Sequence, residues 1–157
     1  PAFVEAAQES HATVGHWMPW CHSNYSRDEA ESWFALASEN QKARLAYELG
    51  IFTADGNSLL GGIGLNHFNR EHNFCNLGYW VRESKQRQGI ATRAASALAE
   101  FGFNALQLTR IEIVIVEANA PSRKVAEKIG AAFECIARNR LIVNGSPYTA
   151  AVYSLVP

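Results

Sequence analysis

The sequence is poor in the features that mark several large classes of protein. Its 157 residues contain three cysteines, Cys21, Cys75 and Cys135, an odd number at wide spacing, which argues against a disulfide framework. A reducing compartment and hence a cytoplasmic location are expected. No apolar run reaches the length of a membrane span, and no series of charged, apolar and small residues indicates a signal peptide. The formal net charge of −1 predicts no general attraction to nucleic acid or to anionic membranes.

Patterns typical of metal and nucleotide sites are incomplete. His67, Glu71 and His72 fall in an expected turn, and no other pair in the chain has ligand spacing, so no metal is expected. Gly62 and Gly64 lack a third glycine and lie inside an expected strand, which excludes the dinucleotide-binding fingerprint. No glycine-rich loop ends in Gly-Lys-Ser/Thr, which excludes a P-loop.

Hydrophobic periodicity and turn residues predict an α/β protein with one mixed sheet, in a single domain over 1–157. Helices are expected over 3–17, 26–44, 89–105 and 120–130, and strands over 44–56, 58–68, 74–81, 110–117, 131–143 and 148–156. The first three strands form an antiparallel meander, because turn residues separate them. The continuous β-branched run in 110–117 predicts burial on both faces of that strand.

Local signals refine these elements. Ser26 and Glu29 form a capping box for the second helix. An apolar stripe on that helix, with Trp33 expected in the core, comprises Trp33, Leu36 and Ala37. Pro121 suits the first turn of helix 120–130 and Gly130 its C-terminal cap. Cys135 is expected to be buried among apolar residues.

The entry to helix 89–105 combines glycine with positive charge. A helix N-terminus offers unpaired N–H groups, and Gly89 lets a ligand approach them without meeting a Cβ atom. Cations nearby suit a phosphate: Arg82, Lys85, Arg87 and Arg93. A phosphate or pyrophosphate cradle is one interpretation, and a solvated basic loop is the other; the spacing alone favours neither.

Three segments resemble the GNAT superfamily of acyl-CoA-dependent N-acetyltransferases. "QRQGIA" (86–91) is similar to the signature Gln/Arg-x-x-Gly-x-Gly/Ala, between a strand and a long helix. "VEANAPSRKVAEKIGAAFE" (116–134) resembles the family's strand–Asn-x-x-Ser–helix–Lys-x-Gly-(x)-Phe segment. "HWMPW" (16–20) resembles the start of the Rim-type branch, whose members acetylate protein N-termini, including those of ribosomal proteins. The resemblance covers nearly the whole chain, and the first strand of the family fold is expected to be missing before Pro1.

The resemblance implies a GNAT fold, a largely antiparallel sheet flanked by helices with a central parallel pair of strands. These strands, 77–81 and 110–117, splay apart to hold acetyl-CoA, the expected co-substrate, by strand addition. The family implies that Val81 holds the pantetheine amides, that Asn119 and Ser122 contact the cofactor arm, and that the pyrophosphate meets Gln86, Arg87, Gln88, Gly89, Ile90, Ala91 and Thr92.

The family chemistry is direct attack of an amine on the thioester, without a covalent enzyme intermediate. By resemblance Ser122 protonates the departing thiolate, and the alternative is that Ser122 caps helix 120–130. The alternative for Asn119 is that it is only a turn residue. Many relatives carry a glutamate where this chain has Asn76, which accepts no proton. Glu48 and Glu117 are the remaining candidates for the base. The alternatives are that each is only an exposed charge on a strand, and that a relay of water molecules acts without a single essential base.

The same resemblance implies which residues line the acceptor site and which class of acceptor is used. Trp17, Trp20 and Tyr79 are expected to line its site, and a primary amine, above all a protein or peptide N-terminus, is expected to be the acceptor. A small-molecule amine is the alternative, and Asn76 favours a third possibility, a non-catalytic acyl-CoA-binding module. No nucleic-acid or membrane partner is expected, and the protein is expected to be a monomer or homodimer.

Overall fold

A computed structural model describes residues 1–157 and is organised around one six-stranded mixed sheet. The strand order is β1-β2-β3-β4-β6-β5, with β3 and β4 parallel and all other neighbours antiparallel. The strands are β1 (Tyr47–Phe52), β2 (Leu59–Asn69), β3 (Phe74–Val81), β4 (Arg110–Val116), β5 (Ala132–Val143) and β6 (Ser146–Leu155). The predicted mixed α/β class and the opening antiparallel meander are confirmed.

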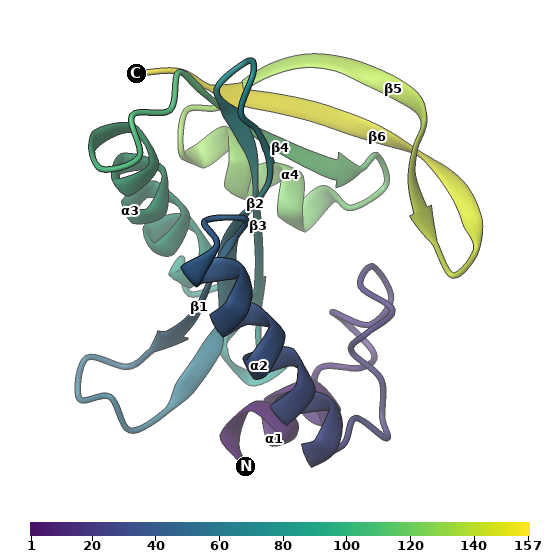
Figure 1. Ribbon diagram of the computed structural model, residues 1–157. Helices are drawn as coiled ribbons and strands as arrows, with labels where there is room; N and C mark the ends of the chain where they lie inside the picture. The colour runs from purple at the N-terminus through teal and green to yellow at the C-terminus, as the bar shows by residue number, and fades with distance from the viewer.

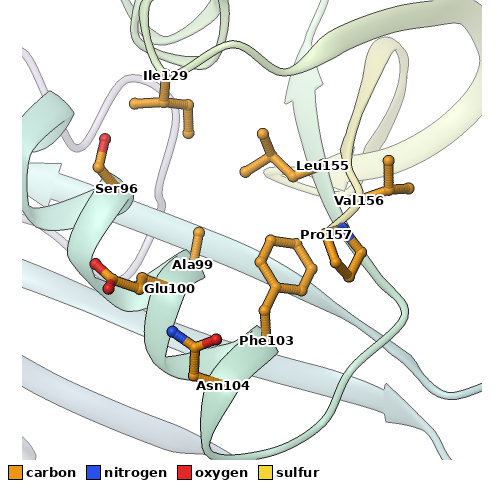
Figure 2. Close-up of a pocket in the computed structure, with 9 residues that line it drawn as sticks. All are labelled: Ser96, Ala99, Glu100, Phe103, Asn104, Ile129, Leu155, Val156 and Pro157. Carbon is orange, nitrogen blue, oxygen red and sulfur yellow. The ribbon is translucent and has the colours of Figure 1, made fainter.

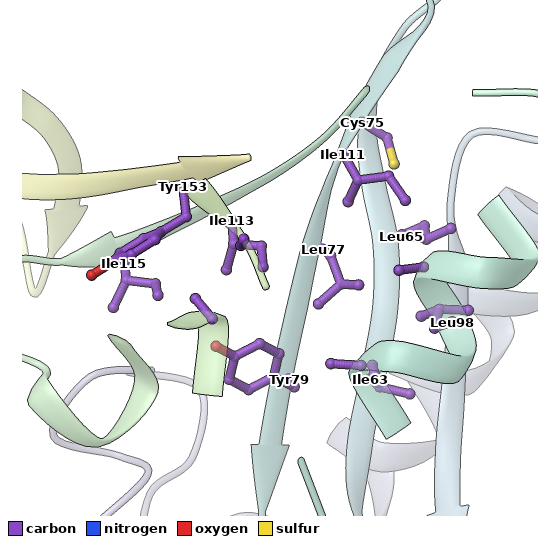
Figure 3. Close-up of a cluster of buried hydrophobic side chains, with 14 of the residues drawn as sticks. Ile63, Leu65, Cys75, Leu77, Tyr79, Leu98, Ile111, Ile113, Ile115 and Tyr153 are labelled. Atoms are coloured by element: carbon purple, nitrogen blue, oxygen red, sulfur yellow. The ribbon is translucent and has the colours of Figure 1, made fainter. Parts of the chain in front are cut away.

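Helices cover the sheet from both sides (Figure 1). The helices are α1 (Ala2–Glu9), α2 (Arg27–Lys42), α3 (Ile90–Asn104) and α4 (Ala120–Lys128), with a 3₁₀ turn, η1 (Glu83–Lys85), before α3. Side chains of α3 and α4 share the main core with alternate residues of β2, β3 and β4, such as Ile63, Leu77 and Ile113 (Figure 3). A smaller core lies under α1 and α2, against Trp80 of β3. Successive strand residues therefore face different helix pairs.

The parallel pair at the centre of the sheet is short. β3 and β4 are in register at three residue pairs only, Phe74 with Arg110, Cys75 with Ile111 and Asn76 with Glu112. Beyond Asn76 the rest of β3 has no paired neighbour on the β4 side. The strands therefore separate in the part of β3 that leads to η1 and α3.

The predicted first helix, 3–17, is wrong in its second half, because α1 ends at Glu9 and turns occupy 10–17. The N–H groups of Thr13 and Val14 both bond the carbonyl oxygen of Ser10, which closes a tight turn. Cys21 Sγ then donates to the carbonyl of Ala7 at 3.2 Å. The chain folds back on α1 instead of continuing it.

The capping box of α2 is confirmed, with Ser26 and Glu29 bonding reciprocally. Its apolar stripe does not form core: Trp33 is 39% exposed and Leu36 is 48% exposed, and only Ala30 of this helix is buried. α2 lies over β1, which is the edge strand of the sheet. An edge strand offers less surface to cover than a central strand, so most of the helix remains exposed.

Three smaller expectations are also corrected. β4 is buried along its whole length on one face only, since Ile111, Ile113 and Ile115 are buried toward α3 and α4 whereas on the other face Val116 is buried and Val114 is half-buried. Cys135 is exposed, because β5 is an edge strand with most of its residues in contact with solvent. Gly130 follows the C-cap residue of α4 and takes the left-handed conformation, with φ 82°.

Candidate functional site

A cleft of about 780 Å³ opens where β3 leaves β4. It is bounded by the end of β3, the N-terminal ends of α3 and α4, and the turns that follow α1. Of the predicted cofactor residues, all except Gln88 line it: Val81, Gln86, Arg87, Gly89, Ile90, Ala91, Thr92, Asn119 and Ser122. Two motifs about thirty residues apart in the sequence thus meet in one cavity.

The N-terminus of α3 supplies donors to this cleft. Gly89 is its N-cap and has φ +72°, a conformation that glycine adopts without steric cost. The N–H groups of Ile90, Ala91 and Thr92 make no hydrogen bond within the protein. Arg87 also has a positive φ, 61°, a strained conformation of the kind that functional loops retain. The helix end is suited to an anion.

Four cations line the cleft without an ion-pair partner: Lys85, Arg87, Lys124 and Lys128. Sequence reasoning did not single out Lys124 and Lys128, although their i, i+4 spacing places them on one face of α4. Arg93 turns back and donates to the carbonyl of Gln88 at 3.1 Å. That bond explains why Gln88 shapes the loop without lining the cleft.

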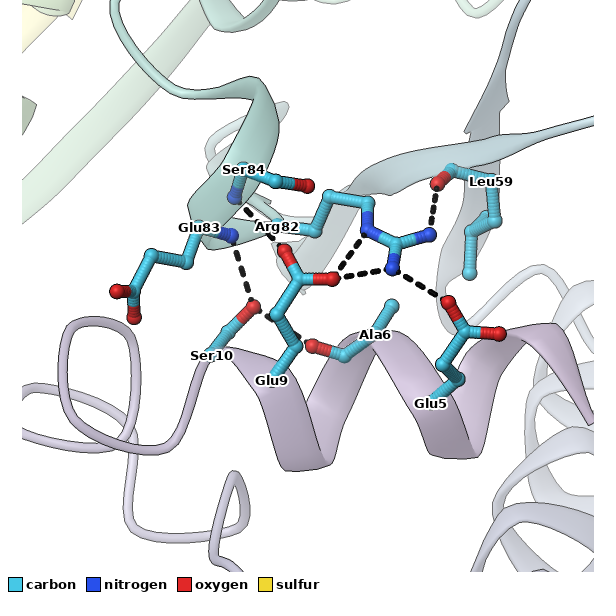
Figure 4. A network of polar contacts seen from close by, with 8 residues as sticks. All are labelled: Glu5, Ala6, Glu9, Ser10, Leu59, Arg82, Glu83 and Ser84. Carbon is cyan, nitrogen blue, oxygen red and sulfur yellow. Dashed lines mark hydrogen bonds and ion pairs between the residues drawn. The ribbon is translucent and has the colours of Figure 1, made fainter.

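Arg82 does not belong to the phosphate cradle, contrary to the prediction. Its side chain is 12% exposed and bonds Glu5 (2.7 Å) and Glu9 (Nε to Oε2, 3.0 Å) of α1 (Figure 4). The hydrogen bond from Arg82 is the main cause that lowers the pKa of Glu9 to about 2. Glu9 also accepts from the N–H of Ser84 at 2.7 Å. Arg82 therefore attaches α1 to the cofactor loop.

Further bonds hold this loop in shape. Gln86 Nε2 donates to the carbonyl of Val81 at 3.1 Å and to Thr13 Oγ1 at 3.2 Å. The N–H of Glu83 donates to Ser10 Oγ at 3.0 Å. The turns after α1 and the loop before α3 are thus one hydrogen-bonded unit, and the unit forms one wall of the cleft.

Ser122 projects its hydroxyl toward β3. Ser122 Oγ donates to Tyr79 Oη at 3.3 Å, and Tyr79 Oη donates to the carbonyl of Ser122 at 2.8 Å. Burial raises the pKa of Tyr79 to about 12, so the phenol keeps its proton at neutral pH. The N-cap of α4 is Asn119, whose side chain accepts from the N–H of Ser122 at 3.3 Å. The alternative that Ser122 caps the helix is therefore wrong.

The candidate bases lie away from the cleft lining. Glu117 is exposed at the end of β4, where its carboxylate accepts from Thr149 Oγ1 at 2.8 Å. Glu48 is half-buried on the sheet face opposite α3 and accepts from Asn66 Nδ2 at 3.0 Å. Asn66 in turn accepts from Asn76 Nδ2 at 3.0 Å. The structure thus connects Glu48 with Asn76, the position at which the family resemblance implies a glutamate.

The predicted acceptor residues separate into two groups. Trp17 and Tyr79 line the cleft. Trp20 does not; it packs against Phe3 and Trp80, with ring centroids 5.9 Å and 5.3 Å away. Trp20 packs against Trp80, which does line the cleft, so Trp20 contacts the cleft wall only from behind.

A second hollow, of about 400 Å³, lies at the far end of α3 (Figure 2). Phe103, Leu155 and Val156 line it together with Ser96 and Glu100, and no cationic side chain lines it. No three His, Cys, Asp or Glu residues lie close enough to hold a metal ion. None of the helices has both the length and the apolar character needed to cross a membrane.

Comparison with known proteins identifies the family. Residues 1–132 match the family described as acetyltransferase (GNAT) domain. The chain belongs to the GNAT acetyltransferase family. The predicted GNAT fold, with its mixed sheet and splayed parallel pair, is therefore confirmed.

Among curated relatives, YoaA of Bacillus subtilis, an uncharacterized N-acetyltransferase, is 34% identical over 107 residues, which are 68% of this chain and 60% of YoaA. This chain thus spans less than two thirds of that protein. YdaF of Bacillus subtilis, named provisionally as a ribosomal N-acetyltransferase, is 31% identical over 98% of this chain and 83% of its own length. Spermidine N(1)-acetyltransferase of Escherichia coli is 23% identical over 79% of this chain and 58% of its own.

Comparison with solved structures points to the same family. One from Vibrio cholerae, described provisionally as a ribosomal-protein-serine acetyltransferase, is 32% identical, has a TM-score of 0.79 and aligns with 98% of this chain and 90% of its own. RimL, a ribosomal L7/L12 α-N-protein acetyltransferase solved with coenzyme A, shares the fold at 21% identity with a TM-score of 0.89. The predicted membership in the Rim-type branch is confirmed, as is acetyl-CoA as the co-substrate of this N-acetyltransferase family.

Proposed function

We propose that this protein transfers the acetyl group of acetyl-CoA to the α-amine of a protein or peptide N-terminus. The observation that carries the proposal is the cleft where β3 leaves β4, with the free N–H groups of α3 at one side. It provides a strand edge for the pantetheine amides and a helix end for the pyrophosphate. The neighbouring lysines and Arg87 supply the balancing charge. A cytoplasmic location and a single domain over 1–157 accompany this proposal.

Ser122 is the proposed proton donor in the reaction. When the amine attacks the thioester carbon, the C–S bond breaks and the CoA thiolate leaves, which requires a proton. Ser122 Oγ lies in the cleft, and its bond to Tyr79 orients it. Because Tyr79 stays protonated, it can donate to the Ser122 carbonyl throughout and keep the start of α4 in place.

Glu48 is the proposed proton acceptor, acting through water. An α-amine has a pKa near 8 and needs only a modest base. Glu48 is half-buried and lies on the same sheet face as Asn76 and Trp80, two strands from the opening between β3 and β4, so that water must connect it with the acceptor. Glu117 is exposed and engaged with Thr149, so we do not retain it as a base.

The charge of this face favours an acceptor with one amine. Glu48 is accompanied by two neutral amides, Asn66 and Asn76. The carboxylate of Glu112, beside Asn76 on β4, is neutralised by Arg110. A polyamine needs several carboxylates, since each buried ammonium must be paired. Acetylation of spermidine is the second candidate function, because the spermidine enzyme of Escherichia coli is a relative.

A comparison of acceptors tests the proposal. We expect kcat/KM for short peptides with a small first residue to exceed that for spermidine at matched ionic strength, measured by release of free CoA thiol. The same peptides with a blocked N-terminus are the control and should release none. A preference for spermidine would assign the protein to the second function.

A further inference from the structure

The apex of the opening between β3 and β4 is closed by a side chain. The register of the parallel ladder ends at Asn76 and Glu112. The next N–H of β4 that faces β3 belongs to Val114, and it donates to Asn76 Oδ1 at 3.3 Å. In a continuous parallel ladder that N–H would bond the backbone of β3 just beyond Asn76. An amide side chain thus takes the place of a ladder bond where the strands diverge.

This amide belongs to a chain of hydrogen bonds across four strands. Asn66 Nδ2 donates to Glu48 Oε1, and Asn76 Nδ2 donates to Asn66 Oδ1, each at 3.0 Å. The bond from Val114 to Asn76 completes it. The Glu48 carboxylate fits because β2 has Gly64 beside it, where a Cβ atom would lie 2.0 Å from Glu48 Oε2.

The chain has one permitted direction. An ionised carboxylate only accepts hydrogen bonds, so Asn66 must present its NH₂ group to Glu48 and its oxygen to Asn76. Asn76 must then present its NH₂ group to Asn66, which leaves its oxygen for Val114. Glu48 therefore fixes the orientation of two amides and, through them, the partner of a β4 backbone group.

We infer that Asn76 is a positioning residue for acyl-CoA binding, and that Glu48 and Asn66 keep its amide in the required orientation. By satisfying the Val114 N–H, Asn76 ends the ladder and leaves the following backbone groups of β3 free for the cofactor. The inference rests on the proposed binding of the pantetheine arm between β3 and β4. It gives a function to the asparagine at the position where the family resemblance implies a glutamate.

The direction of the chain suggests a reversal experiment. In Asn76→Asp the new carboxylate faces Asn66 Oδ1, and Asn66 cannot turn over because its oxygen would then face Glu48. Adding Glu48→Gln removes this conflict, since the amide introduced on β1 can donate to Asn66, and Asn66 can then donate to the carboxylate introduced on β3. The double variant E48Q/N76D has the same net charge as the wild type, with the chain reversed.

Calorimetric titration with CoA reads the result without turnover. We expect N76D to raise the Kd for CoA about tenfold, which corresponds to about 1.4 kcal/mol. We expect E48Q alone to stay within about twofold of the wild type, because the introduced amide keeps an oxygen that can accept from Asn66 and so preserves the native direction. The double variant should recover to about threefold of the wild type, a non-additive pattern typical of residues in contact. Wild-type affinity in N76D, or a double variant that binds no better than N76D, would overturn the inference.

Two further variants complete the design. Asn69→Asp adds the same charge on β2 but keeps an acceptor for the N–H of His72, at 2.8 Å in the native chain, so its affinity for CoA should not change. If N76D does not fold, Asn66→Leu breaks the chain without adding charge and should weaken CoA binding about fivefold; unchanged affinity there would equally overturn the inference. Loss of peptide acetylation in E48Q with intact CoA binding would support Glu48 as the base and would leave the role of Asn76 untouched. The proposed base and the positioning role of Asn76 can therefore fail separately.

Discussion

On the α3 and α4 side of the sheet, the cleft is lined by backbone N–H groups and by cations without partners. On the α1 and α2 side, the Glu48 carboxylate and two amides are joined by hydrogen bonds across the strands. The first arrangement suits a highly charged phosphate ligand, and the second suits a small, nearly neutral acceptor. In the proposed function the sheet separates the two kinds of ligand, and the opening between β3 and β4 is where they would meet.

Two arginines on the cofactor loop show the same contrast over a short stretch of chain. Arg82 is almost buried and bonded to Glu5 and Glu9, whereas Arg87 lines the cleft with no acidic partner. Burial of a charge is tolerated only with a partner, so Arg82 can contribute to stability but not to ligand binding. Charge in a sequence motif therefore indicates a phosphate site only after its partners are known.

The largest expected effect is on the phosphate side. Gly89→Glu places a carboxylate at the N-terminus of α3, where the pyrophosphate is proposed to bind, and we expect the affinity for acetyl-CoA to fall beyond about a thousandfold, or about 4 kcal/mol. Gly89→Gln is the control, with the same size and the same left-handed backbone position but no charge. Calorimetry and circular dichroism measure binding and folding. Equal losses in both variants would assign the effect to the backbone conformation instead.

Ser122→Ala should come next in size. If Ser122 protonates the thiolate, kcat should fall about 10²–10⁴-fold, with the KM for acetyl-CoA nearly unchanged. Ser26→Ala is the matched control, because Ser26 caps α2 outside the cleft and its loss should cost about 1 kcal/mol of stability with kcat unchanged. A fall in the melting temperature of S122A without a fall in kcat would remove the catalytic role.

The third prediction concerns the attachment of α1 to the cofactor loop. Because the pKa of Glu9 is lowered to about 2 in the folded protein, its contribution to stability is present above its ordinary value near 4.5 and is lost as the pH falls toward 2. Allowing for partial screening, Glu9→Gln should lower the free energy of unfolding by about 1–3 kcal/mol at pH 7. Urea titrations at pH 7 and pH 3 measure it; a penalty that does not shrink at pH 3 would contradict the pKa.

The smallest effect is expected from one lysine of α4. Lys124→Ala removes one solvent-exposed charge from the cleft and should raise the KM for acetyl-CoA about two- to fivefold, since such a pair contributes about 0.5–1 kcal/mol. The effect should shrink as salt is added. Arg138→Ala on β5, outside the cleft, is a control that should leave the KM unchanged.

The extent to which the sequence predicts this protein differs between the two sides of the sheet. The cofactor loop is contiguous, so Gly89 and its neighbours could be assigned directly. The pair Asn144-Gly145 is another local signal, and it lies in the turn between β5 and β6 with φ 49° and 76°. The bonds of Glu48 to Asn66 and of Asn66 to Asn76 depend on strand register. No single stretch of the sequence contains that information.

Other expectations did not hold because they depended on tertiary neighbours. The spacing of Trp33 and Leu36 predicts an apolar stripe, but it does not show that the helix would lie over an edge strand. Arg82 has the charge expected of a phosphate ligand, but its partners come from α1, more than seventy residues earlier in the chain. Periodicity and charge describe a segment and leave its neighbours undetermined.

The three residue pairs that join β3 to β4 also have a mechanical meaning. They are the narrowest connection between one half of the sheet, β1-β2-β3, and the other, β4-β6-β5, so bending should concentrate along this line. A pantetheine arm bonded along the free part of β3 would stiffen it. We therefore expect the amides of Tyr79 and Val81 to exchange hydrogen faster in the empty protein than in the CoA complex, so that each catalytic cycle alternately stiffens and loosens the middle of the sheet.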